Sequence, residues 1–196
     1  MKNTKLFFLA GVIILTGVAF LFYKKYSNQP QKQSPGAENK KIISNILNNM
    51  KISSPVFQNN ANIPPIYTCD AEGINPPLEI GGIPENTKSL ALLMDDPDAP
   101  LEGGFVHWVV FNLDPGIKEI AENSKPESGT EGINSTGKIG YTPPCPPSGT
   151  HHYQFKLYAL DTILNLTSSA KREDVEKAME RHILDEAMLV GLYQRQ

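Results

Sequence analysis

Two uninterrupted apolar runs, from Ser89 to Asp96 and from Phe105 to Asn112, stand near the middle of the chain. A strand with one exposed face alternates apolar and polar residues, whereas a strand covered on both faces is apolar almost throughout. The two runs therefore predict two neighbouring strands in the interior of a layered structure.

Each of these apolar runs also contains polar residues that could form a site. The first run ends at Asp96 and turns at Pro97, whose missing backbone N–H stops a strand. The second run carries His107, which two-residue alternation places on the same apolar face as Phe105, Val109 and Phe111. An acidic strand end and an imidazole in a neighbouring strand together predict a polar pocket in apolar surroundings.

The run from His151 to Leu160 shows the clearest alternation in the chain, and it follows the stretch richest in proline and glycine. One face carries His151, Tyr153 and Phe155, and the opposite face begins with His152. We therefore expect His151 and Tyr153 to point into the structure and His152 to point away from it.

Helical spacing is convincing in one region, from Lys171 to Ala187. Glu173 and Asp174 stand in its first turn, where the helix dipole favours acidic side chains. Val175 and Met179 recur on one face of the predicted helix. After Ala187 the pattern predicts a short strand or an extended segment.

Shorter segments complete the predicted architecture. Ile52 to Phe57 and Ile66 to Cys69 have β-like composition, and Pro76 to Ile80 predicts an edge strand because prolines begin it. Asp114 to Ser135 is polar and is expected to be a loop with little regular structure. The 15 glycines and 16 prolines fall between short apolar runs, a pattern that favours a mainly β fold with many turns.

The overall composition is that of a globular protein, with 40% hydrophobic and 20% charged residues. Its 196 residues suffice for one domain with extensions. A net charge of −3 gives no electrostatic basis for a nucleic-acid partner. Cys69 and Cys145 are too few for a disulfide scaffold, and the sequence leaves open whether they form a single bond.

The N-terminal part of the chain predicts a membrane segment. Residues 6–23 are uncharged, follow the short flank at 1–5, and are near the minimum length for spanning a bilayer. A cleaved secretory signal is the alternative, but cleavage after Ala19 would leave an apolar stretch on the mature protein. We expect an anchor at 6–23, a flexible linker at 24–45 and a folded domain at 46–196. That domain would lie outside the cytoplasm, or be secreted if the segment is cleaved.

Six short motifs occur in the order and approximate spacing of one protein family. They are DPDAP at Asp96–Pro100, HW at His107–Trp108, NSTGK at Asn134–Lys138, CPPSG at Cys145–Gly149, HHY at His151–Tyr153 and LYALD at Leu157–Asp161. Over roughly residues 50–195 the chain resembles the phosphatidylethanolamine-binding protein family, also called the Raf kinase inhibitor protein family, in its bacterial and archaeal branch. One motif alone would be weak, whereas six in order are specific.

The resemblance implies an antiparallel β-sandwich with a few short helices and a small pocket at one end that binds phosphate or phospholipid head groups. The residues that match the family's pocket are Asp96, Asp98, His107, Pro147, His151 and Tyr153. The chain departs from the family pattern at Phe105, where tryptophan is common, at Thr142–Pro143, where Gly-Gly is usual, and at His152, which replaces a frequent arginine. The family also includes inhibitors of kinases and serine proteases, so a protein target is the alternative partner.

The matched residue types suit an anion. An imidazole donates hydrogen bonds and becomes cationic near pH ~6.5, so His107 and His151 favour a bound phosphate, and Tyr153 adds a hydroxyl. A carboxylate at Asp96 repels phosphate, so it must orient a histidine, meet an ethanolamine ammonium or hold a proton. The alternative is structural: Asp96 and Asp98 would cap a turn, and the histidines would be polar groups of the core.

Catalytic and metal sites are disfavoured. Cys145 is followed by Pro146 and lacks a helix N-terminus that would activate its thiol. A zinc site of Cys145, His151 and His152 conflicts with alternation, because adjacent strand residues face apart. We therefore expect no catalytic role, no metal and no cofactor. A hydrolase acting through the same pocket stays a third hypothesis beside ligand binding and protein regulation.

Overall fold

The computed structural model describes residues 50–195. The predicted anchor at residues 6–23 and the predicted linker at 24–45 lie outside these described residues. Within residues 50–195, no helix has the length and the apolar character needed to cross a bilayer.

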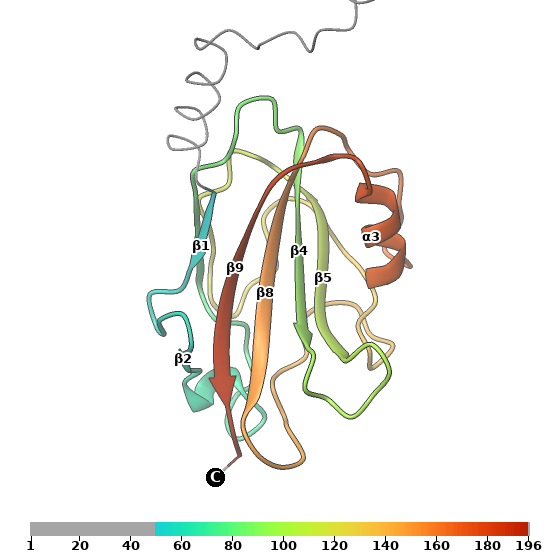
Figure 1. Ribbon diagram of the computed structural model, residues 1–196. Helices are drawn as coiled ribbons and strands as arrows, with labels where there is room; N and C mark the ends of the chain where they lie inside the picture. Colours follow the sequence, from blue (N-terminus) through green and yellow to red (C-terminus); the bar gives the residue numbers. More distant parts are fainter. Residues whose placement is uncertain (1–49, 196) are drawn as a thin grey trace, which may run out of the picture. The chain divides into compact units, whose positions relative to one another are not determined.

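Two β-sheets of mainly antiparallel strands form most of this region (Figure 1). The smaller sheet has the strand order β1-β3-β6, and the larger has the order β2-β9-β8-β4-β5-β7. The elements are β1 (Lys51–Ser53), β2 (Ala61–Asn62), the 3₁₀ helix η1 (Pro65–Tyr67), β3 (Leu78–Gly81), β4 (Ser89–Asp96), β5 (Phe105–Leu113), β6 (Glu119–Ile120), β7 (Thr130–Glu131), β8 (His151–Leu160), α3 (Arg172–Met179) and β9 (Ile183–Tyr193). The prediction of a mainly β fold is confirmed.

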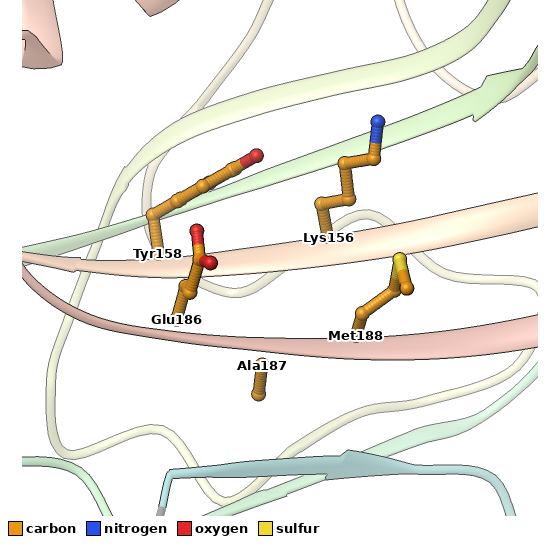
Figure 2. Close-up of a pocket in the computed structure, with 5 residues that line it drawn as sticks. All are labelled: Lys156, Tyr158, Glu186, Ala187 and Met188. Atoms are coloured by element: carbon orange, nitrogen blue, oxygen red, sulfur yellow. The ribbon is translucent and has the colours of Figure 1, made fainter.

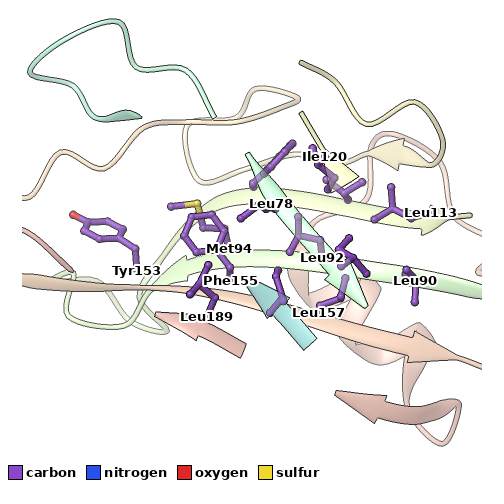
Figure 3. Packing of buried hydrophobic residues seen from close by; sticks show 14 of the residues in the cluster. Leu78, Leu90, Leu92, Met94, Leu113, Ile120, Tyr153, Phe155, Leu157 and Leu189 are labelled. Atoms are coloured by element: carbon purple, nitrogen blue, oxygen red, sulfur yellow. The ribbon is translucent and has the colours of Figure 1, made fainter. Parts of the chain in front are cut away.

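Strand β4 is buried on both faces, as its uninterrupted apolar run predicts. It pairs with β5 along one edge and with β8 along the other. Leu92 and Met94 pack between the two sheets with Leu78 of β3 (Figure 3). Leu93 faces the opposite side and packs beneath α3 with Val175. Each such buried side chain contributes about 1.5–3 kcal/mol, so the two layers that cover β4 hold the domain together.

The predicted helix from Lys171 to Ala187 is too long. Helix α3 ends at Met179, and β9 begins at Ile183. Between them Arg181 has a φ of 69°, a left-handed conformation that a continuing α-helix excludes. From Ile183 onward the chain pairs with β8. The backbone hydrogen bonds gained along that edge outweigh the local preference for helix.

Three shorter predictions also need correction. Ile66 to Cys69 is not β: η1 covers Pro65–Tyr67, and proline at its start favours a helical turn. Strand β3 is the central strand of its sheet, paired with both β1 and β6, because the prolines before Leu78 leave the following N–H groups free to pair. The segment from Asp114 to Ser135 is mostly loop, as predicted, but it includes β6 and β7.

The close approach of β9 to the segment around β2 gives a test of the packing. A Cβ atom at Gly191 would lie 2.4 Å from Cγ1 of Ile63 and 3.1 Å from Cε2 of Phe57. We expect Gly191→Ala to lower the free energy of unfolding by about 1–3 kcal/mol, because the extra methyl group overpacks the core. Urea unfolding followed by circular dichroism measures the change.

Gly81 of β3 provides the matched control, because a Cβ atom there meets nothing within 4 Å. Gly81→Ala should change the free energy of unfolding by less than about 0.5 kcal/mol. Equal losses for the two variants would contradict the packing of Ile63 against β9.

Candidate functional site

One end of the sandwich contains a cavity of about 470 Å³. Strand β4 ends there while its antiparallel partners β5 and β8 begin there, so the three strand ends meet. The lining residues are Asp96, Ala99, Pro100, Leu101, Phe105, His107, Thr136, Thr142, Pro143, Cys145, Pro146, Pro147 and His151. Most of this wall is apolar, and its titratable side chains are Asp96, His107 and His151.

Asp96 and His151 form a buried pair. Nδ1 of His151 donates to Oδ2 of Asp96 over 2.7 Å, and both side chains are more than nine-tenths buried. The other carboxylate oxygen, Oδ1, accepts the backbone N–H of Asp98 at 2.9 Å. A carboxylate only accepts, so the His151 proton lies on Nδ1 and the lone pair of the neutral ring lies on Nε2. Asp96 thus fixes both the orientation and the tautomer of His151.

His107 reaches the cavity through a β-bulge. In the pairing of β4 with β5, Met94 lies opposite Trp108 and Asp95 lies opposite Val106, so His107 is an extra residue without a partner on β4. A bulge of this kind turns one side chain out of the regular alternation. The prediction that His107 shares a face with Val109 and Phe111 is therefore wrong, because those two residues pack beneath α3. The part of the prediction that concerns Phe105 is confirmed, since its ring lies 4.7 Å from that of His107 and both line the cavity.

The position of His107 in the bulge also determines its hydrogen bonds and its protonation. Its Nδ1 donates to the carbonyl oxygen of Thr142 at 2.7 Å, and the N–H of Thr142 donates back to the His107 carbonyl at 2.9 Å. Burial lowers the pKa of His107 below its ordinary value of 6.5, although the Thr142 carbonyl and the charge of Asp96 act in the opposite direction. His107 is thus held with Nε2 as an acceptor at neutral pH.

Tyr153 lies beneath the two imidazoles. Its ring meets that of His107 edge-on, with 5.2 Å between the ring centres, and is stacked with that of His151 at 6.4 Å. The side chain is fully buried and is not among the residues that line the cavity. Burial, the charge of Asp96 and a hydrogen bond with that carboxylate raise the pKa of Tyr153 well above its ordinary range. Tyr153 thus supports the two imidazoles from beneath and does not form the cavity wall.

Asp98, which was predicted to help build the pocket, does not line the cavity. Its Oδ2 accepts the backbone N–H of His152 at 2.8 Å and Nδ1 of the same residue at 2.7 Å. The hydrogen bond from His152 lowers the pKa of Asp98. Both side chains are about half exposed, and His152 points away from the interior, as alternation predicts. The pair fastens the turn after β4 to the outer face of β8.

The turn after β4 supplies wall residues that sequence reasoning missed. Gly104 has a φ of 75°, and a Cβ atom there would lie 2.6 Å from the carbonyl oxygen of Asp96. This glycine lets the turn fold back against the strand end. Leu101 then stands at the rim of the cavity with 56% of its surface exposed. The available signal was a single large apolar side chain in a turn made otherwise of proline, glycine, alanine and two acidic residues.

The two cysteines form a disulfide between Cys69 and Cys145. This answers the question that the sequence left open, and it removes Cys145 as a candidate thiol nucleophile. Among residues 50–195 there is no group of three or more histidine, cysteine, aspartate or glutamate side chains placed to hold a metal ion.

A second hollow lies on the outer face of β8 and β9 (Figure 2). Lys156, Tyr158, Glu186 and Met188 project from that face, while Ala187 points the other way. Nζ of Lys156 pairs with Asp95 of β4 at 3.1 Å. No histidine lines this hollow, and its lysine is already paired, so it offers less to an anion than the cavity at the strand ends.

A family model, curated relatives and solved structures were compared with this chain, and their matches agree with one another. A family model described as phosphatidylethanolamine-binding protein matches residues 53–194. A UPF0098 protein of Methanothermobacter thermautotrophicus is 48% identical over 151 residues, covering 74% of this chain and 99% of that protein. The crystal structure of a putative phosphatidylethanolamine-binding protein homologue from Chlamydia trachomatis has a TM-score of 0.73 at 38% identity, covering 76% of this chain and 99% of its own. YbcL of E. coli, described as a new member of the mammalian family, has a TM-score of 0.70 at 27% identity, covering 75% and 99%.

The buried imidazole of His107 makes stability depend on pH. Because its pKa is lowered in the folded state, the unfolded chain takes up the proton first, at pH ~6.5. The contribution of His107 to stability should be complete above that pH and should decline as the pH falls toward its folded pKa. Urea unfolding of the wild type and of His107→Gln, at several pH values from 7.5 to ~4.5, measures this contribution. A wild-type advantage that is constant across the series would mean that burial leaves the imidazole unperturbed.

Proposed function

Because the chain belongs to the phosphatidylethanolamine-binding protein family, whose model matches residues 53–194, we propose that it binds anionic phosphorylated small molecules or phospholipid head groups. The binding site is the cavity around Asp96, His107 and His151. The observation that carries the proposal is the pair of imidazoles, each held through Nδ1 and each leaving Nε2 without a hydrogen bond within the described residues.

Proton balance supports an anion that binds together with a proton. A phosphate oxygen needs a donor, but both Nε2 atoms carry a lone pair when the rings are neutral. Either an imidazole takes up a proton, or the phosphate arrives with a proton of its own. In both cases the complex holds one more proton than the neutral ring and the phosphate dianion. Affinity for phosphate therefore falls as the pH rises.

The hydrogen bonds that Asp96 already accepts support one orientation of the ligand. Asp96 is the only acidic residue among those that line the cavity. One of its oxygens accepts a hydrogen bond from His151 and the other from the Asp98 N–H. An ethanolamine ammonium would therefore meet no unengaged carboxylate. We place the phosphate at the imidazoles and the rest of the ligand along the apolar wall toward Leu101.

The same lining residues favour binding over catalysis. The Thr136 hydroxyl donates to Oδ1 of Asn134 at 2.6 Å, and the Asn134 side-chain amide donates to the Thr142 hydroxyl at 3.0 Å. Cys145 is held in the disulfide. No hydroxyl or thiol of the lining thus stands beside a histidine as an activated nucleophile.

A second candidate function is hydrolysis of a phosphoester by a bound water. The Asp96–His151 pair favours it, because a carboxylate that orients an imidazole is also the arrangement of a general base. Continued release of product from a phosphoester, lost in His151→Ala, would support this candidate over simple binding.

We also propose that residues 6–23 tether the domain to a membrane and hold it outside the cytoplasm. The support is their uncharged composition and length. The Cys69–Cys145 disulfide agrees with an oxidising compartment, where such bonds persist. Secretion after cleavage of the segment is the alternative.

Membrane fractionation of the full-length chain and of a chain lacking residues 1–41 tests the tether. The full-length protein should stay in the membrane pellet after a carbonate wash, because an inserted apolar segment resists it, while the truncated chain should be soluble. A soluble full-length product whose N-terminal residue is Phe20 would show that the segment is a cleaved signal.

Calorimetric titration with inorganic phosphate tests the binding site. His151→Ala should weaken binding by about 1.5–3 kcal/mol, the value of a hydrogen bond to a charged group. His152→Ala is the matched control and should have almost no effect, since that side chain points away from the cavity. The wild-type affinity should fall between pH ~6 and ~8. Equal losses for both variants would reject the site, whereas tight binding to a protease that His151→Ala leaves intact would favour a protein target.

A further inference from the structure

The part of the cavity wall that precedes β8 is held by few backbone hydrogen bonds. This proline wall, residues 142–149, has prolines at four of its eight positions, and proline lacks the N–H that would form a backbone hydrogen bond. At its start Thr142 bonds to His107 in both directions. Beyond Thr142, its backbone hydrogen bond within the described residues is the one from the Cys69 N–H to the Pro144 carbonyl, at 3.0 Å.

The disulfide acts at the same place. Cys69, just after η1, holds the proline wall through its backbone N–H and also through its sulfur, which bonds to Cys145. Cys145 lines the cavity next to Pro146 and Pro147. The covalent bond thus fixes the middle of the wall, next to Pro144.

The end of the proline wall beside β8 permits movement if that bond is broken, while Thr142 keeps its two hydrogen bonds to His107. Gly149 has a φ of 71°, and a Cβ atom there would meet nothing within 4 Å, so the end beside β8 is open. The prolines stiffen the intervening chain, which would therefore move as a unit about Thr142 and Gly149.

The disulfide is accessible and lies apart from the core. Cys145 is exposed and Cys69 is partly exposed, so a soluble dithiol can reach the bond. The core clusters that include β4 draw on the two sheets, α3, η1 and neighbouring loops, and neither cysteine is among their residues. Reduction should free the wall without unfolding the sandwich.

We propose that the redox state of the Cys69–Cys145 pair sets the affinity of the cavity for its phosphate-containing ligand. This proposal rests on the proposed function. With the disulfide formed, the proline wall stands in the arrangement that completes the cavity. A dithiol reductant transfers two electrons and two protons to the bond, leaving two thiols and becoming a disulfide itself. The released wall then completes the cavity for only part of the time, and the apparent affinity falls in proportion.

Titration of the oxidised and the dithiol-reduced wild type with inorganic phosphate tests the proposal. If the released wall occupies its bound arrangement about a tenth of the time, the dissociation constant rises about tenfold on reduction. The double variant Cys69→Ser/Cys145→Ser should match the reduced wild type and should not respond to the dithiol. Far-ultraviolet circular dichroism reports whether the strands of the domain stay folded on reduction.

Each remaining outcome overturns a defined statement. Equal phosphate affinity in the two redox states, with the oxidised protein binding normally, overturns the redox proposal alone. Absence of phosphate binding by the oxidised protein overturns the proposed function on which it rests. Loss of the strand signal in far-ultraviolet circular dichroism on reduction would show that the bond supports the whole domain, and it would also overturn the proposal.

Discussion

The complete burial of β4 is the constraint on which the rest of the domain depends. An apolar strand whose eight residues are all buried needs a partner on each edge and a layer on each face. Strands β5 and β8 supply the edges, the three-stranded sheet covers one face, and α3 with its neighbouring loops covers the other. The cavity follows from the same arrangement, because β4 ends in the carboxylate of Asp96 at the level where its partners carry His107, near the start of β5, and His151, at the start of β8.

Much of this could be predicted from side-chain periodicity, and the exceptions have physical causes. Alternation placed His151 and His152 on opposite faces of β8, and the uninterrupted run identified β4 as an interior strand. The face of His107 could not be predicted, because one inserted residue in the β4–β5 pairing reverses the phase and leaves no mark in composition. The partner of Asp98 is His152 of β8, which is distant from it in sequence. The end of α3 is set by the pairing of the following strand, β9, with β8.

The cavity contains no permanently charged cation. No lysine or arginine is among its lining residues, and the one charge that its buried pair introduces is negative. Nearby basic side chains are engaged elsewhere: Lys156 and Arg172 both approach Asp95, which faces the opposite side of β4 from Asp96. The selectivity of the proposed phosphate site would therefore come from tautomers and from the protons that a ligand brings with it. Such a site would distinguish protonation states of one ligand as well as different ligands.

The contact between the two ends of the domain also determines when the chain can fold. The side-chain oxygen of Asn59 accepts the N–H of Val190, a residue 131 positions later, and Phe57 and Ile63 pack against β9 at Gly191. The ribosome releases the N-terminal residues first, so these apolar side chains stay unburied until β9 has been synthesised. Strand β4 likewise lacks one of its paired strands until β8 has been synthesised. The domain can therefore complete its folding only once β8 and β9 have been synthesised, and until then its most apolar strand stays exposed.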